Sequence, residues 1–258
     1  MTRGGMETPV YSFKGDTDAI LPSAGLVEMD GTLYGTTDEG GEYGYGTVYI
    51  VAPTGGETVL YSFQGGSDGA SPEGGLVAMN HKLYGTTAEG GSADGGTVFS
   101  ITPKGREQVL YSFTGGADGG YVYAPLIDVG GTLYGTTGGG GTNNAGTVFS
   151  ITATGTERVI YSFQNGKDGF VPEAALLYVN GTFYGTTGLG GGSSTCPYGC
   201  GIAFSVTPAG VEKVLHQFTG GTDGSQPIAP LIDLGDKLYG TAGGGGYNGN
   251  GVIFEIKP

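Results

Sequence analysis

The sequence predicts an all-β protein, a five-bladed β-propeller built of four-stranded blades. The motif Leu-Tyr-Gly-Thr-Thr begins at Leu33 and recurs, with small changes, down the whole chain of 258 residues. Its tyrosines are separated by 50, 50, 50 and 55 residues, at Tyr34, Tyr84, Tyr134, Tyr184 and Tyr239. A repeat of this length is typical of propellers and solenoids. The 58 glycines also disfavour helices, because each interior glycine costs a helix about 1 kcal/mol.

Each copy is predicted to contain four short strands. In the second copy these strands are 75–79, 82–87, 97–102 and 108–113. The second strand alternates Leu83 and Gly85 with Tyr84 and Thr86, which suits a sheet with two different faces. The third is rich in β-branched and aromatic residues, and a Pro-Lys-Gly turn follows it. A four-stranded unit of this length matches one propeller blade.

The two ends of the chain predict how the ring closes. The segment before Phe13 repeats the fourth strand of the other copies, whereas the last copy stops after its third strand. We therefore expect residues 8–13 to complete the last blade as its outer strand. A solenoid would instead need distinct polar caps. The prediction is a single domain, 1–258, with blade cores at approximately 25–63, 75–113, 125–163, 175–218 and 230–258 plus 8–13.

Several features bear on where the protein works. No apolar stretch of about 18 residues is present, so no membrane insertion is expected. Met1 to Met6 contain no apolar segment of a secretion signal. Cys196 and Cys200 lie together in the insertion that lengthens the fourth repeat, which favours a disulfide that staples this loop and an oxidising compartment. A pair of free thiols is the alternative, and two cysteines without a nearby histidine argue against zinc.

The repeat resembles a known bacterial family. The elements Gly-Thr-Leu-Tyr-Gly-Thr-Thr, Gly-Thr-Val-Phe-Ser-Ile-Thr-Pro and Val-Leu-Tyr-Ser-Phe are similar to those of the GloVer tandem repeat, and the resemblance covers all five copies. It implies an extracellular or cell-surface location. It brings no catalytic residues. The larger members carry C-terminal anchors, whereas this chain shows neither a signal nor an anchor, so attachment to the surface stays open.

The negative charge of the chain excludes some classes of partner, and the sequence predicts that it is concentrated on one face. The net charge is −14, and most of it falls on the loops that join the second strand to the third and one blade to the next. We call the face that carries these loops the top. An acidic field repels nucleic acid and anionic membranes, so neither is expected as a partner. Neutral polymers, cations and basic partners remain possible, and solubility alone is the plainer interpretation. The protein is expected to be a monomer.

One aspartate recurs in the loop that enters each blade. These residues are Asp18, Asp68, Asp118, Asp168 and Asp223, usually within Gly-Gly-x-Asp-Gly. Calcium binding is one interpretation, because calcium seeks six to eight oxygen ligands. Each blade offers only one regular aspartate, however, and aspartate before glycine commonly bonds its own backbone in a turn. The structural turn is therefore the favoured interpretation, calcium stays possible, and no cofactor is expected.

Aromatic residues outside the repeat pattern suggest a binding surface on the top. These are Tyr43, Tyr45, Tyr121, Tyr123, Phe170, Tyr198 and Tyr247. A sugar ring has an apolar face and hydroxyls at its edge, so tyrosines beside carboxylates and amides suit it. The leading hypothesis is a lectin-like, multivalent module for neutral carbohydrate, whose weak sites gain avidity by linkage. The alternative is that some of these rings pack between blades.

Two other classes of function compete with carbohydrate binding. A glycoside hydrolase needs two carboxyl groups that face one bond in the central funnel, and Glu73 and Glu173 are the best candidates because they break the repeat. Their neighbours are mostly small or apolar, which weakens this assignment. His81 and His216 fall outside the funnel, so Ser-His and Cys-His chemistry is poorly supported. A purely structural scaffold that displays other surface components is the third class.

Overall fold

A computed structural model describes residues 8–52 and 55–258, and it contains five antiparallel sheets. The expected absence of a signal in Met1 to Met6 concerns residues outside this part. The first sheet contains β1 (Val27–Met29), β2 (Thr32–Thr37), β3 (Thr47–Val51) and β4 (Glu57–Ser62). The second contains β5 (Val77–Met79), β6 (Lys82–Thr87), β7 (Thr97–Ile101) and β8 (Glu107–Ser112). The third contains β9 (Ile127–Val129), β10 (Thr132–Thr137), β11 (Thr147–Thr152) and β12 (Glu157–Ser162).

The fourth sheet contains β13 (Leu177–Val179), β14 (Thr182–Thr187), β15 (Ile202–Val206) and β16 (Glu212–Gln217). The fifth contains β17 (Ile232–Asp233), β18 (Leu238–Ala242) and β19 (Val252–Ile256). A short 3-10 helix, Gly66–Asp68, lies between the first two sheets. The all-β prediction is confirmed, and the strands lie within two residues of the positions expected for the second copy.

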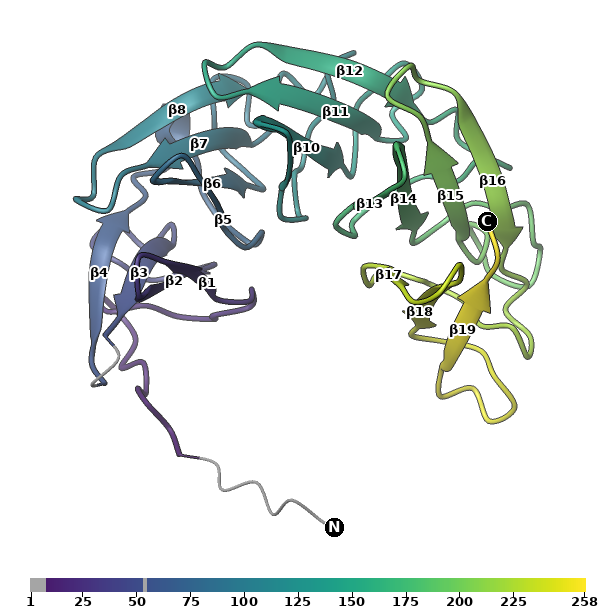
Figure 1. The fold of residues 1–258 in the computed structure, drawn as a ribbon, viewed down its shortest axis with the longest axis horizontal. Coiled ribbons are helices and arrows are strands. Elements are labelled where there is room, and N and C mark those ends of the chain that lie inside the picture. Colours follow the sequence, from purple (N-terminus) through teal and green to yellow (C-terminus); the bar gives the residue numbers. More distant parts are fainter. Residues whose placement is uncertain (1–7, 53–54) are drawn as a thin grey trace.

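The sheets are arranged side by side in an arc, as in a β-propeller, and we call each sheet a blade (Figure 1). The short first strands, such as β5 and β13, line the inside of the arc, and β4, β8, β12 and β16 lie on its outside. First strands of neighbouring blades contact one another, as β1 does β5. The third and fourth strands of blades one to four share a register shift at the same point, between Val98 and Phe99 in blade two.

The core lies between blades rather than within them. One buried cluster joins Tyr34 and Val48 of blade one to Leu83 and Phe99 of blade two, and similar clusters join the later pairs. A phenylalanine after the fourth strand packs edge-on against the aromatic ring of the next blade's third strand, as Phe63 does against Phe99 at 5.1 Å. Because blades one to four each supply such a phenylalanine to the next blade, each of these repeats stabilises its neighbour.

Two residues of the Leu-Tyr-Gly-Thr-Thr motif have clear structural roles. The glycine leaves room for the aromatic ring of the third strand, since a Cβ on Gly85 would lie 2.5 Å from the Phe99 ring. The threonine that follows it donates a hydrogen bond to the next blade, and Thr36 Oγ1 lies 3.2 Å from the Gly74 carbonyl oxygen. The same bond recurs from blades two, three and four. The shared motif therefore belongs to the scaffold.

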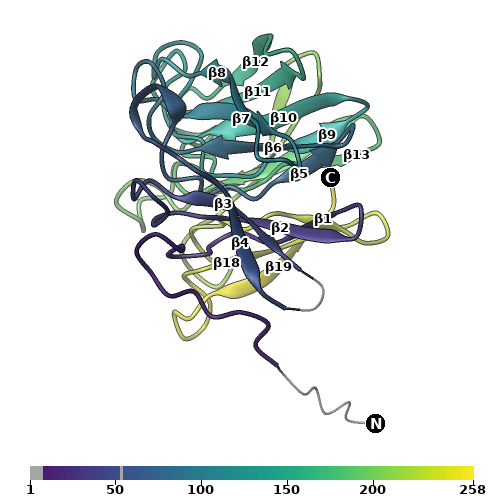
Figure 2. The same ribbon diagram turned by 90° about the vertical axis from the view of Figure 1, so that its left-hand side faces the viewer.

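The expected closure of the ring differs from the structure. The fifth sheet has three strands, and residues 8–13 form no strand in the described part of the chain. Phe13 instead packs against Tyr49 of blade one, with ring centroids 5.1 Å apart, and the Tyr11 hydroxyl donates to Asp18 at 2.8 Å. These contacts hold the segment on blade one. The arc stays open between blade one and blade five, and residues 8–13 lie on the blade-one side of this opening (Figures 1 and 2).

The stapled loop is confirmed. Cys196 and Cys200 form a disulfide, with their Cα atoms 5.3 Å apart. In the part of the chain that the structure describes, no helix is long and apolar enough to span a membrane.

Candidate functional site

The loops that carry the candidate residues do meet on one face, the top. In every blade the loop after the second strand pairs with the loop that enters the blade, as Ala70 does with Glu89. Backbone hydrogen bonds run in both directions between these two residues, at 2.9 and 3.1 Å. The pairing fixes the two loops against each other, so each blade presents one combined loop surface.

Glu73, Tyr123 and Glu173 come from the loops that enter three consecutive blades, shortly before the innermost strands β5, β9 and β13. Burial raises the pKa of Glu73, and the charges of Asp38 and Glu173 raise it further. Burial also raises the pKa of Glu173. The Tyr123 hydroxyl has a raised pKa because of burial and because Glu73 and Glu173 are both near. The structure thus brings the two candidate carboxyl groups into electrostatic reach of each other, with a tyrosine between their blades.

Glycines of the same blade support the two tyrosines of blade three. A Cβ on Gly138 would lie 2.8 Å from the Tyr123 ring, and one on Gly139 would lie 3.0 Å from the Tyr121 ring. Tyr121 has a left-handed backbone, with φ of 61°, and its side chain is 45% exposed. A non-glycine residue rarely adopts this backbone unless its surroundings hold it there. The same backbone recurs at the equivalent position of every blade, so it belongs to the loop pairing, and the Tyr121 ring is accessible.

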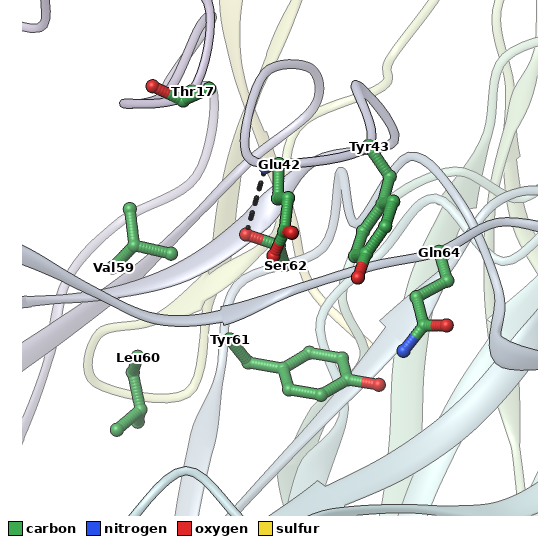
Figure 3. Close-up of a pocket in the computed structure, with 8 residues that line it drawn as sticks. All are labelled: Thr17, Glu42, Tyr43, Val59, Leu60, Tyr61, Ser62 and Gln64. Carbon is green, nitrogen blue, oxygen red and sulfur yellow. Dashed lines mark hydrogen bonds between the residues drawn. The ribbon is translucent and has the colours of Figure 1, made fainter.

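A pocket of about 450 Å³ lies beside Tyr43 in blade one. Figure 3 shows the rings of Tyr43 and Tyr61 and the amide of Gln64 around the same space. The Glu42 N–H donates to Ser62 Oγ at 3.2 Å, which ties the loop to the end of β4. The sequence predicted Tyr43 but not Tyr61 or Gln64, because Tyr61 belongs to the repeated pattern and was assigned to the scaffold.

A second pocket, of about 430 Å³, lies between loops of blade four. Asn165, Phe170, Ser193 and Tyr198 line it. In both blades the loop after the second strand supplies an exposed tyrosine. The pocket of blade one lies between that loop and β4, whereas the pocket of blade four lies between that loop and the entering loop. The disulfide holds the loop of Tyr198, and Ser193 Oγ donates to the Thr219 carbonyl oxygen at 2.9 Å.

The structure does not gather all the predicted aromatic residues. Tyr45 lies over Gly65, where a Cβ would be 2.8 Å from its ring, so it packs on the loop that enters blade two. Tyr247 is 94% exposed and lines neither loop pocket. The remaining five lie at three separate places, which are the pocket of blade one, the inner rim at blade three and the pocket of blade four.

The repeated aspartates shape turns. Asp68 accepts a backbone hydrogen bond from Gln64 N–H at 2.7 Å and a bond from the Tyr61 hydroxyl at 2.8 Å. Equivalent backbone bonds reach the other four, Asp18, Asp118, Asp168 and Asp223. Among the described residues, no group of three or more His, Cys, Asp or Glu side chains is placed to hold a metal ion. The geometry therefore agrees with the turn interpretation.

A glutamate that the sequence analysis did not identify lies near each of four of these aspartates, at the start of the fourth strand of the blade that the aspartate's loop enters. Burial and, to a smaller extent, the charge of Asp68 together raise the pKa of Glu107 to about 7. The other three, also with pKa values of about 7, are Glu57, Glu157 and Glu212. In each of the four, one carboxyl oxygen is buried and has no hydrogen-bond partner in the structure. Their recurrence at intervals of 50, 50 and 55 residues was the signal that could have revealed them.

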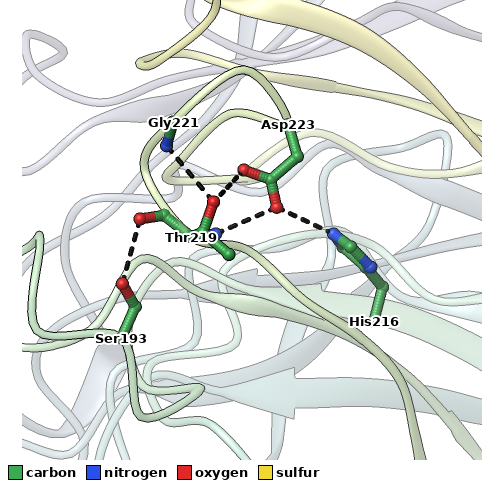
Figure 4. Close-up of polar contacts among 5 residues, drawn as sticks. All are labelled: Ser193, His216, Thr219, Gly221 and Asp223. Carbon is green, nitrogen blue, oxygen red and sulfur yellow. Dashed lines mark hydrogen bonds and ion pairs between the residues drawn. The ribbon is translucent and has the colours of Figure 1, made fainter.

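His216 replaces the tyrosine of this arrangement in the last complete junction. Its Nε2 lies 3.1 Å from Asp223 Oδ2, and Asp223 also accepts bonds from the Thr219 N–H and hydroxyl (Figure 4). Burial opposes ionisation of Asp223, but the Thr219 and His216 hydrogen bonds prevail and lower its pKa. His81 is exposed and lies 3.3 Å from Asp30. Neither histidine contacts Glu73 or Glu173.

Comparison with known proteins supports the repeat and the fold. Residues 1–198 match the family model of the Gloeobacter/Verrucomicrobia repeat. No curated protein matches the sequence. A luciferin-regenerating enzyme is 12% identical, with a TM-score of 0.52, over 95% of this chain and 80% of that one. A glucose dehydrogenase is 17% identical, with a TM-score of 0.50, over 87% of this chain and 79% of that one. At such low identity these likenesses show the fold alone.

Proposed function

The chain belongs to the Gloeobacter/Verrucomicrobia repeat family, and we propose that this member binds neutral carbohydrate through tyrosine-bearing loop pockets on its acidic face. One observation carries the proposal. Blades one and four, which differ in loop sequence and length, each form a pocket of similar size that includes an exposed tyrosine from the loop after the second strand. The two pockets form in loops whose sequences differ between the repeats, so the blade does not need them for its stability, and we infer that they bind a ligand.

The chemistry of both pockets suits a sugar. The rings of Tyr43 and Tyr61, and those of Phe170 and Tyr198, offer apolar surfaces for the C–H face of a pyranose. The amides of Gln64 and Asn165 and the hydroxyl of Ser193 offer donors and acceptors for its hydroxyls. Glu42 accepts hydrogen bonds but repels anions, so uncharged sugars are favoured.

Two pockets on one chain can raise the affinity for a long polysaccharide. A polymer that reaches both sites binds the second one intramolecularly, so its affinity exceeds that of either site alone. Short oligosaccharides should therefore bind weakly and long chains more tightly. The exposed ring of Tyr121 at the inner rim, on a blade between the two pockets, offers a third contact along such a path.

Binding to a panel of neutral polysaccharides tests the proposal, with and without a calcium chelator. We expect retention of at least one polymer, and at least a tenfold loss of affinity when Tyr43→Ala and Tyr198→Ala are combined. Tyr247→Ala is the matched control, because this tyrosine lines neither pocket and its loss should change affinity less than twofold. Loss of binding in the presence of the chelator would indicate that calcium is required and would make the repeated aspartates candidate calcium ligands. Retention of full affinity by the double variant would reject the pockets.

Hydrolysis of a glycoside is the second candidate, and the inner rim favours it. Glu73 and Glu173 both have raised pKa values, as a general acid requires, and they stand on blades two apart with Tyr123 between them. Activity on a bound polymer that disappears in Glu73→Gln or Glu173→Gln would support this function. Activity retained in both variants would reject the assignment. If the polysaccharide panel shows neither binding nor hydrolysis, the protein is better explained as a structural scaffold.

An extracellular or cell-surface location fits this function. A disulfide in an exposed loop persists in an oxidising environment, and a polysaccharide ligand is met outside the cell. Fractionation of cells that produce the protein, followed by immunoblotting without reductant, tests the location.

A further inference from the structure

A third pocket on the top lies between blades four and five. It has a volume of about 260 Å³, and its lining residues are Val171, Glu173, Gly188, Leu189, Gln226 and Ile228. These residues come, in pairs, from the loop that enters blade four, the loop after β14 and the loop that enters blade five. It shares no lining residue with the pockets beside Tyr43 and Tyr198. This pocket is therefore a separate site.

Backbone hydrogen bonds hold together the three loops that form this pocket. The Gly188 N–H donates to the Val171 carbonyl oxygen at 3.0 Å, which joins the two loops of blade four. The Gln226 N–H donates to the Cys200 carbonyl oxygen at 2.8 Å, which joins the loop that enters blade five to blade four. The pocket is thus preformed, so a ligand does not have to order its walls.

The glycine at position 188 leaves the space of this pocket open. A Cβ on Gly188 would lie 3.2 Å from Cγ2 of Ile228. Blades one and two carry a side chain at the same position, Asp38 and Ala88. Blade three has a glycine there as well, but the Tyr123 ring covers it, 2.8 Å from where a Cβ of Gly138 would be. A side chain therefore occupies this place in the first three blades but not in blade four.

The pocket combines apolar walls with one carboxyl group that has no partner. Val171, Leu189 and Ile228 supply the apolar walls. Glu173 is half-buried, and burial raises the pKa of its carboxyl group. In the described part of the chain, the three ion pairs involve other residues, and no side chain donates a hydrogen bond to this carboxyl group. A half-buried carboxylate without a partner is unfavourable, and a bound cation would offset this cost.

The surroundings of the pocket favour a cation over an anion. The charges of Asp38, Glu173 and Glu89 all raise the pKa of Glu73, so these four acids lie within electrostatic reach of one another's site. The summed field of such carboxylates attracts positive groups and repels negative ones. The apolar walls add a second requirement, because a fully hydrated metal ion gains nothing from them, whereas a cation on an aliphatic stem does.

We propose that this pocket binds a lysine side chain of a basic protein partner. The ammonium group pairs with the Glu173 carboxylate and donates to the side-chain carbonyl oxygen of Gln226, and its four-carbon stem lies against the apolar walls. Gln226 and Ile228 are both exposed, so a chain segment on the surface of another protein reaches the pocket. Glu173 holds a positive charge in this role and transfers no proton.

Binding of two short peptides tests this proposal. The probe is N-acetyl-Gly-Lys-Gly-amide, and the comparison peptide contains norleucine, which keeps the four-carbon stem without the charge. NMR titration of the full chain measures both affinities. We expect the lysine peptide to bind at least about tenfold more tightly than the norleucine peptide, because only lysine supplies a partner for the half-buried carboxylate.

Three variants locate the site. Glu173→Gln should weaken binding of the lysine peptide at least about tenfold. Glu39→Gln is the matched control, because Glu39 is an exposed acid of the same face that does not line the pocket, and it should change the affinity less than about twofold. Gly188→Ala gives blade four the residue of blade two, and it should also weaken binding because its methyl group enters the pocket.

Each outcome of these titrations decides for or against the pocket. Loss of lysine binding in Glu173→Gln with retention in Glu39→Gln supports the proposal. An equal loss in both variants would overturn it in favour of general attraction to the acidic face. No binding of the lysine peptide, or equally tight binding of the norleucine peptide, would overturn it as well. None of these measurements involves a polysaccharide, so this proposal and carbohydrate binding fail separately.

Discussion

The carboxyl pairs at the blade junctions predict that the protein loses stability as the pH rises from 5 to 8. Glu107, Glu157 and Glu212 have pKa values of about 7 in the folded chain, against an ordinary value of 4.5. The neutral form is therefore favoured by folding. The stability that each glutamate contributes is complete below pH 4.5, and it is lost as the pH rises through 7.

The magnitude follows from the same values. A rise from 4.5 to about 7 corresponds to about 3.4 kcal/mol for a fully shielded group. These glutamates are half-buried, so solvent screening reduces the effect to about 1 kcal/mol each. The three junctions involve different blade pairs, so their effects should nearly add, to about 3 kcal/mol.

Guanidinium unfolding at pH 5 and pH 8 measures this difference. Glu157→Gln keeps the shape of the neutral acid, so it should change the free energy of unfolding little at pH 5 and increase it by about 1 kcal/mol at pH 8. Glu42→Gln, on an exposed loop, is the control and should change neither value. An equal effect of Glu157→Gln at both pH values would refute the assignment of a protonated glutamate to this junction.

Three further predictions concern the scaffold and the loops. Gly85→Ala should destabilise the protein by about 1–3 kcal/mol in thermal unfolding, because the new methyl group would lie 2.5 Å from the Phe99 ring. The control Gly25→Ala has open space around it and should change the stability by less than about 0.5 kcal/mol. Cys196→Ser/Cys200→Ser should lower the free energy of unfolding by at most about 2 kcal/mol, because the loop that the disulfide closes is short. The same change should weaken polysaccharide binding more in a Tyr43→Ala background than in a Tyr198→Ala background, because the disulfide holds the loop of Tyr198. Glu173→Gln should lower the pKa of Glu73, because the charge of Glu173 helps to raise it, and NMR titration of labelled glutamate checks this; an unchanged pKa of Glu73 would place the two carboxyl groups apart.

The sequence alone predicted most of the blade and its disulfide. Repetition made this possible, because five copies show which residues the scaffold needs, and Gly85 and Phe99 occupy positions that recur in every blade or nearly so. The disulfide was evident because Cys196 and Cys200 are the only cysteines and share one insertion.

What the sequence could not predict depends on contacts between distant residues. The segment at Tyr11 and Phe13 reads as an outer strand, but its pattern does not say which blade it pairs with, and the structure holds it on blade one. Tyr61 was assigned to the scaffold, yet its ring also faces the pocket beside Tyr43. The carboxyl pairs were missed because Asp68 and Glu107 are far apart in the sequence and come near each other only in the folded chain.

Calorimetric titration of the unmodified protein and of the Tyr43→Ala/Tyr198→Ala variant with a polysaccharide retained from the panel tests the central claim most directly. The account predicts heat of binding for the unmodified protein, and a loss of at least tenfold in affinity for the variant while its thermal unfolding stays unchanged. No binding of any neutral polysaccharide, or equal affinity of the two proteins, would contradict the claim that these loop pockets bind carbohydrate.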